Sequence, residues 1–174
     1  MNRLVLLAAL ASLAPASLAQ VQTNVPIHQH SATDVIDGSQ HPDQIPDIAA
    51  YRMVLLSLSK PANRTELQAT HQNVQLRSAG LNDSEKSVLI PILAKFNSDY
   101  HALIQSYNAA ATAANARGER ADIGSFLIKR DQLVQATHDQ IKGIFTADRW
   151  TQFDAYVQQE KKHMKIGRGE VSKY

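Results

Sequence analysis

The stretch LNDSEKSVLIPILAKFNSDYHALIQSYNAAATAANARG, residues 81–118, decides the fold of this chain. Asn82 and Glu85 form a capping-box pair, in which the Asn side chain accepts from backbone N–H groups and the Glu side chain reaches back. Apolar or small residues then alternate at spacings of four and three, the seam of a coiled-coil-like face: Leu89, Leu93, Phe96, Tyr100, Leu103, Tyr107, Ala110 and Ala114. We therefore expect one helix over residues 83–117, about 50 Å long at ~1.5 Å per residue.

The residues on both sides of this helix predict four more. The first is expected over 46–59, and the second over 63–79 with Asn63 and Glu66 as its capping pair. The fourth is expected over 122–142, and the fifth begins at Thr146 as N-cap. Short turns join the last three helices and favour antiparallel neighbours, so the predicted fold is an all-α antiparallel helical hairpin or bundle of about five helices. The seam of the long helix faces either its own chain or a partner chain; the sequence leaves both open.

The first nineteen residues have the pattern of a secretory signal peptide. Met1-Asn2-Arg3 is a positive start, an apolar run follows, and Ser17-Leu18-Ala19 supplies small residues for cleavage. We expect a mature protein that begins at Gln20, is periplasmic or secreted, and has no membrane span after cleavage, because the apolar run is too short to cross a bilayer. Cleavage after Ala16, or retention of the segment as an anchor, are the alternatives.

The mature chain reads as one domain with irregular ends. Residues 20–45 carry Pro26, Gly38 and Pro42 with little periodicity, which predicts a flexible arm; a helical domain over 46–166 and a basic tail over 167–174 follow. The chain has no cysteine, which excludes disulfides and a thiol nucleophile. Its formal charge of +2 does not call for nucleic acid as a partner.

Two of the predicted helix starts have the same pattern. Each has a large apolar residue, a capping residue, two intervening positions and a long polar side chain. The residues concerned are Leu81, Asn82 and Glu85 in the first start and Phe145, Thr146 and Arg149 in the second.

This pattern resembles the paired Leu-Thr-x-x-Gln motif of the periplasmic Spy/CpxP-like family, over about residues 80–165. Asn82 replaces the Thr of the first copy, Phe145 replaces the Leu of the second, and Glu85 and Arg149 stand where the family has Gln. The resemblance implies a curved helical dimer that binds unfolded protein without ATP, or that senses stress or metals.

The favoured function is therefore an exported, non-enzymatic binding protein, a Spy-like chaperone or envelope-stress protein whose partners are unfolded proteins. The client face would combine aromatic and basic side chains, although aromatic residues at helical spacing also suit a core. The candidate client-binding residues are Phe96, Tyr100, Trp150, Phe153, Lys161 and Lys162.

Two alternatives have other sequence features behind them. One is a structural or assembly protein, such as a homodimer, that pairs through the seam of the long helix. The other is a periplasmic metal-binding or metal-sensing protein, because His28, His30 and His41 carry imidazoles of the kind that bind Zn or Cu. A solvated polar arm explains the same histidines.

Enzymatic chemistry has no motif in this sequence. The chain lacks a Gly-x-Ser-x-Gly nucleophile elbow and a Gly-rich phosphate loop. Glu160 and His163 have the spacing of one half of a di-iron site, but the second half is missing. We expect neither an enzyme nor a cofactor.

Overall fold

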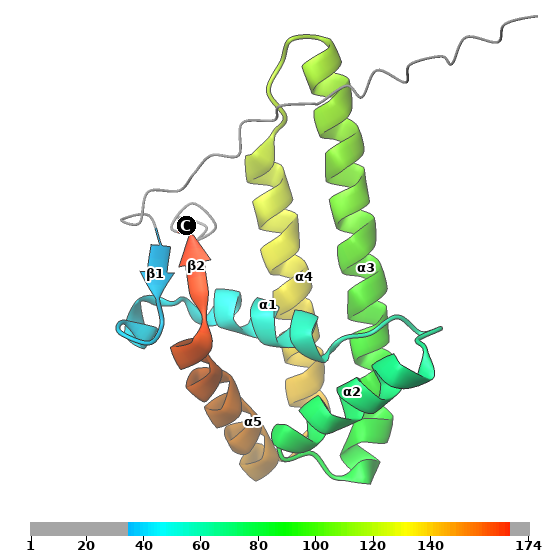
Figure 1. The fold of residues 1–174 in the computed structure, drawn as a ribbon, viewed down its shortest axis with the longest axis vertical. Coiled ribbons are helices and arrows are strands. Elements are labelled where there is room, and N and C mark those ends of the chain that lie inside the picture. The colour runs from blue at the N-terminus through cyan, green and yellow to red at the C-terminus, as the bar shows by residue number, and fades with distance from the viewer. Residues whose placement is uncertain (1–34, 168–174) are drawn as a thin grey trace, which may run out of the picture.

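The computed structural model describes residues 35–167, which form five α-helices and one small sheet (Figure 1). The elements are β1 (Val35–Asp37), the 3-10 turn η2 (Pro42–Gln44), α1 (Asp47–Leu58), α2 (Glu66–Ser78), α3 (Asp83–Ala116), α4 (Ile123–Ile144), α5 (Ala147–Glu160), the 3-10 turn η3 (Lys161–His163) and β2 (Lys165–Gly167). The predicted all-α class is confirmed. Among the helices within these residues, none combines the length and the apolar content needed to cross a bilayer.

The long helix α3 pairs with α4 as an antiparallel hairpin that extends beyond the rest of the molecule (Figure 1). Its start is the predicted capping box: Asn82 Oδ1 accepts from the Glu85 amide and Glu85 Oε2 from the Asn82 amide, each at 2.9 Å. Gly118 follows the helix end with a φ of 72°, which a glycine adopts without strain. The lower seam, including Leu89 and Phe96, is buried. This lower part of the seam therefore packs within its own chain.

The helix α1 crosses the lower half of this hairpin and also packs against α5 (Figure 1). Its buried residues contact α4 and α3 on one side and α5 on the other. The core of the molecule lies around this crossing and includes Ala50, Leu55, Leu93, Val134, Ile141, Phe153 and Val157. The upper half of the hairpin extends past α1, so its face there lacks that cover.

The two ends of the described chain pair as the strands β1 and β2. They are antiparallel, with Ile36 opposite Ile166, and both isoleucines are buried. Gly38 lies beside η3, where a Cβ atom would come within 1.8 Å of the Lys161 carbonyl oxygen, so only glycine fits. Two expectations are corrected. The described part of the predicted arm, from Val35, contains a strand and a 3-10 turn and buries Ile36 and Ile45, and within the helical domain predicted to reach residue 166 the last α-helix ends at Glu160.

The start of α2 also differs from the prediction. Thr65 and Gln68 form the capping box, where Asn63 and Glu66 were expected; Thr65 Oγ1 accepts from the Gln68 amide at 3.3 Å, and Gln68 Oε1 accepts from the Thr65 amide at 2.8 Å. This helix lies at the edge of the molecule, and most of its residues are exposed (Figure 1).

Candidate functional site

An open apolar groove lies where α1 meets the uncovered part of the hairpin. It encloses about 330 Å³ and is lined by Arg52, Met53, Leu56, Tyr100, Ile123, Phe126, Leu127 and Arg130. We call it the α1–hairpin groove. At its rim, Met53 is 40% and Ile123 is 56% exposed, while Arg52 and Arg130 are buried. Large exposed apolar side chains gathered around a hollow are typical of an interaction site.

Local sequence explains both exposed rim residues. The helix α1 is apolar around most of its circumference, so burying Val54 and Leu55 against its neighbours leaves Met53 facing outward. On the other side of the groove, Asp122 caps α4, because its Oδ1 accepts from the Ser125 amide at 3.1 Å. The hydrogen bonds from Ser125 lower the pKa of Asp122, which keeps the cap ionised. This cap places Ile123 in the first turn, above the point where α1 crosses.

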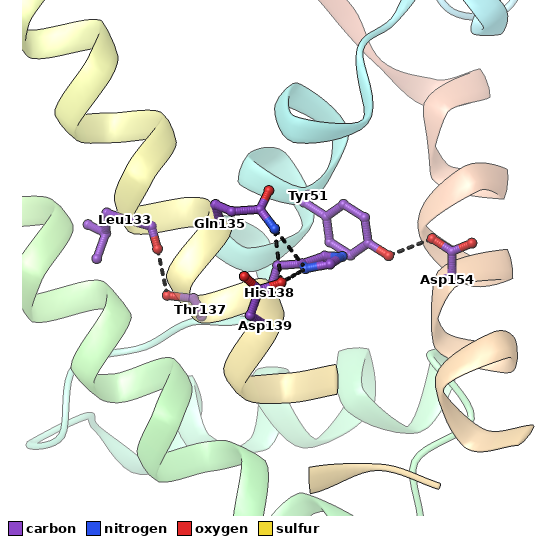
Figure 2. A network of polar contacts seen from close by, with 7 residues as sticks. All are labelled: Tyr51, Leu133, Gln135, Thr137, His138, Asp139 and Asp154. Carbon is purple, nitrogen blue, oxygen red and sulfur yellow. Dashed lines mark hydrogen bonds and ion pairs between the residues drawn. The ribbon is translucent and has the colours of Figure 1, made fainter. Parts of the chain in front are cut away.

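A cluster of aromatic rings joins α1, α4 and α5; Figure 2 shows two of its members, Tyr51 and His138. The rings of Tyr51 and Trp150 are stacked with centroids 6.0 Å apart, and His138 lies edge-on to both, at 4.5 Å and 4.8 Å. The Tyr51 hydroxyl donates to Asp154 Oδ1 at 2.5 Å. Burial, and then this acceptor, raise the pKa of the Tyr51 phenol well above its ordinary value. The hydroxyl thus stays protonated and holds α1 to α5.

Neighbouring side chains of α4 fix the orientation of the His138 ring. Its Nδ1 lies 2.8 Å from Asp139 Oδ1, and the same carboxylate accepts from the Gln135 amide at 2.9 Å (Figure 2). The contact with His138 lowers the pKa of Asp139. Since Tyr51 is only 4% exposed, we assign this aromatic cluster to the packing of the three helices.

The two similar helix starts meet at the lower end of the molecule. Arg149 Nε lies 3.2 Å from Glu85 Oε1, so the last residues of the two patterns form an ion pair. Arg149 Nη2 also donates to the Ala79 carbonyl at 2.9 Å, and its guanidinium lies over the Phe145 ring. Leu81 is buried beside this contact region. Thr146 caps α5 as expected, by accepting from the Arg149 amide. These contacts fasten the starts of α3 and α5 together.

The structure corrects the predicted client-binding face. Phe96 and Phe153 are 1% and 0% exposed, because both pack in the core, and neither can contact a client in this fold. Lys161 is also buried, and its Nζ lies 2.5 Å from Asp47 Oδ1. Trp150 is half-buried in the aromatic cluster, and Lys162 is exposed on η3.

One of the six, Tyr100, does lie in the groove. Met53, Ile123 and Leu127, which line it with Tyr100, are functional candidates that no sequence motif marks. The sequence feature that could have found them is that α1 and α4 carry more apolar residues than one buried helix face can hold.

The predicted metal ligands are not brought together among the described residues. His28 and His30 lie outside the described residues, and His41 is exposed just before η2. Within residues 35–167, no three His, Cys, Asp or Glu side chains form a group that could hold a metal ion. The metal-binding alternative therefore stays a prediction about the histidines near the N-terminus.

Comparison with known proteins found no matching family model, no matching curated protein and no matching solved structure. Function is therefore inferred from the groove and from the sequence patterns.

Proposed function

We propose that this chain is an exported, non-enzymatic binding protein that holds apolar segments of unfolded proteins in the α1–hairpin groove without ATP. The observation that carries the proposal is the exposure of Met53 and Ile123 on the rim of an apolar hollow. The signal-peptide pattern supports export, and the resemblance of the two helix starts to the Spy/CpxP-like motif supports this activity.

The shape of the groove suits a weak and tolerant binder. It is open rather than closed, and Leu56, Leu127 and aromatic side chains are among the residues that line it. Met53 is flexible and polarisable, so it can pack against side chains of different shapes. Burying one large apolar side chain contributes roughly 1.5–3 kcal/mol, so one or two such contacts would hold a client only transiently. Transient binding of many sequences is what an ATP-independent holding activity requires.

The first test is the aggregation of an unrelated unfolding protein, measured by light scattering with the mature protein from Gln20 and without ATP. We expect suppression at near-stoichiometric ratios. Replacing both rim residues, Met53→Gln and Ile123→Gln, should raise the protein concentration needed for half-suppression several-fold, because polar side chains remove apolar contact area.

The matched control is Ile144→Gln, which changes an exposed isoleucine of the same helix outside the groove. It should leave suppression unchanged. Circular dichroism and thermal melting establish that each variant is folded. A folded wild-type protein with no suppression would exclude the holding activity, and suppression that survives both rim changes would exclude the groove as its site.

A further inference from the structure

The helix α2 has an apolar stripe on the side that faces away from the molecule. Leu67 and Val74 are 64% and 57% exposed, and they lie seven residues apart on one face. The opposite face is the packed one, since Gln72 and Leu76 are buried there. A single exposed apolar residue is ordinary, but two at heptad spacing lie on one line along the helix surface, as residues of a helix-pair seam do.

The charges of α2 are arranged about the centre of this stripe. Glu66 lies in the first turn and Arg77 in the last, and both are exposed on the outer face of the helix. Thr70 and His71, also exposed, lie between the two apolar residues. The outer face thus has an acidic end, an apolar middle and a basic end.

This arrangement is complementary to itself when reversed. If a second α2 lies antiparallel across a two-fold axis near His71, Glu66 of each copy approaches Arg77 of the other. In the same register, Leu67 of each copy approaches Val74 of the other. A parallel pair would instead place Glu66 against Glu66 and Arg77 against Arg77, which is repulsive at both ends.

We propose that the outer face of α2 is a dimerisation surface, and that its occupant is the antiparallel α2 of a second copy of this chain. The surface is separate from the α1–hairpin groove, so it adds a partner rather than a second client site. A contact between two helices of 13 residues falls below the ~1,200 Å² of a standard interface, so the dimer should be weak and reversible. The charges then set the orientation of the pair more than its strength.

Sedimentation velocity over a concentration series tests whether the pair forms. We expect monomers at low micromolar concentration and a rise toward twice the monomer mass at hundreds of micromolar. Leu67→Gln with Val74→Gln should move that rise at least tenfold higher in concentration, whereas Ile144→Gln, the matched exposed change on α4, should not move it. The proposal would be overturned by a folded protein that stays monomeric at all concentrations, or by a dimer whose concentration dependence is the same with and without the two α2 substitutions.

Charge reversal tests the antiparallel orientation. Glu66→Lys alone and Arg77→Glu alone should each weaken the dimer, because each creates two like-charge contacts. The two changes in one chain should restore it, and so should mixing the two single variants, since both combinations again pair opposite charges. Weakening by the single variants without rescue in either combination would contradict this register. Circular dichroism checks that Lys at residue 66, near the positive helix start, leaves α2 folded.

A cysteine near the axis gives a third, independent readout. The chain has no cysteine, so His71→Cys would carry a single thiol, close to the same residue of the other copy. Oxidation should produce a covalent dimer on non-reducing gels much faster than for Thr151→Cys, a matched exposed position on α5. Equal rates for the two variants would indicate random collision and not a pair through α2.

Discussion

At the scale of single residues, Tyr51 shows how one side chain can hold three helices. Its ring stacks on Trp150 of α5 and meets the edge of His138 of α4, while its hydroxyl donates to Asp154. The ring contributes apolar burial, and the hydroxyl contributes one hydrogen bond to a charged acceptor. These two contributions can be separated by experiment because Phe has the same ring.

We expect Tyr51→Phe to lower the free energy of unfolding by about 1.5–3 kcal/mol, the usual range for a hydrogen bond to a charged group. The change leaves the half-buried Asp154 without its hydroxyl donor and keeps the ring in place. Urea denaturation followed by circular dichroism measures the difference. Tyr156→Phe, at another half-buried tyrosine of α5, is the control. Equal losses for the two variants would show that the Asp154 contact has no special weight.

Lys161 shows why some residues could not be placed from the sequence. A lysine near a helix end in a basic segment reads as a solvated cation. Its partner Asp47 is 114 residues away, at the start of α1, and only the fold brings the two together. Tyr100, predicted as a client-binding residue, lines the groove because it lies where the seam of α3 leaves the cover of α1; its role there stays a prediction. No local pattern marks that point.

At the scale of elements, the helix starts are also the places where helices are joined. The ion pair of Glu85 with Arg149 connects the first turn of α3 to the first turn of α5, and Arg149 also binds the carbonyl of Ala79 just after α2. Both charged side chains are mostly buried. One side chain therefore ties together three elements at the lower end of the molecule.

A double-mutant cycle with Glu85→Gln and Arg149→Met should give a coupling free energy within about 0.5–3 kcal/mol, because the two groups are in direct contact and mostly removed from water. Urea denaturation of the four proteins supplies the values. Arg117 and Glu119 form the control pair, since they also make an ion pair, at 2.8 Å, but are exposed in the turn after α3. Their coupling should be within about 0–1 kcal/mol. A larger coupling at the exposed pair would contradict this account.

Helix ends were predictable to the extent that they depend on neighbours in the sequence. The caps at Asn82 and Thr146 were predicted correctly, because a capping hydrogen bond spans three residues. The start of α2 was placed at Asn63 because Asn63 with Glu66 and Thr65 with Gln68 offer the same pattern two residues apart. The local signal cannot choose between them.

The small sheet could not be predicted, because its strands come from opposite ends of the described chain. Strands of three residues have little stability of their own and depend on the burial of Ile36 and Ile166. The α1–hairpin groove was missed for a related reason. Its existence depends on where α1 crosses the hairpin, which is a property of tertiary packing.

At the scale of the whole molecule, two carboxylates join segments far apart in the sequence: Asp37 links β1 to β2, and Asp47 links the start of α1 to the end of α5 and η3. Hydrogen bonds from Ser39, together with Lys165 of the paired strand, lower the pKa of Asp37 from its ordinary 3.8 to about 2. Hydrogen bonds from Lys161 and Gln158 lower the pKa of Asp47. In the folded state each of these two carboxylates binds a proton less readily than in the unfolded state. Folding is therefore favoured while the carboxylates are ionised.

We expect the free energy of unfolding to fall as the pH drops below about 4, the ordinary aspartate range. The loss from Asp37 should continue toward its folded pKa of about 2. Above the ordinary range the contribution of both residues is fully present. Urea denaturation from pH 7 to pH 2 measures the free energy of unfolding as a function of pH. In the double variant Asp37→Asn with Asp47→Asn, this free energy should fall less steeply at acid pH. Asp43→Asn, at an exposed carboxylate of η2, is the control. An equally steep fall at acid pH in the double variant would contradict this assignment.

The pairing of β1 with β2 makes the connectivity of this fold circular. Val35 and Gly167 are opposite each other in the sheet, so the described chain returns to its starting point. The turn at Gly118 lies far out on the hairpin, where a Cβ atom would meet nothing within 4 Å. A circular permutant that joins residues 167 and 35 through a short linker and opens the chain after Gly118 would keep every helix and its packing, because chain ends and exposed turns tolerate such rearrangement. The order in which the helices are synthesised is therefore separable from the architecture that they build.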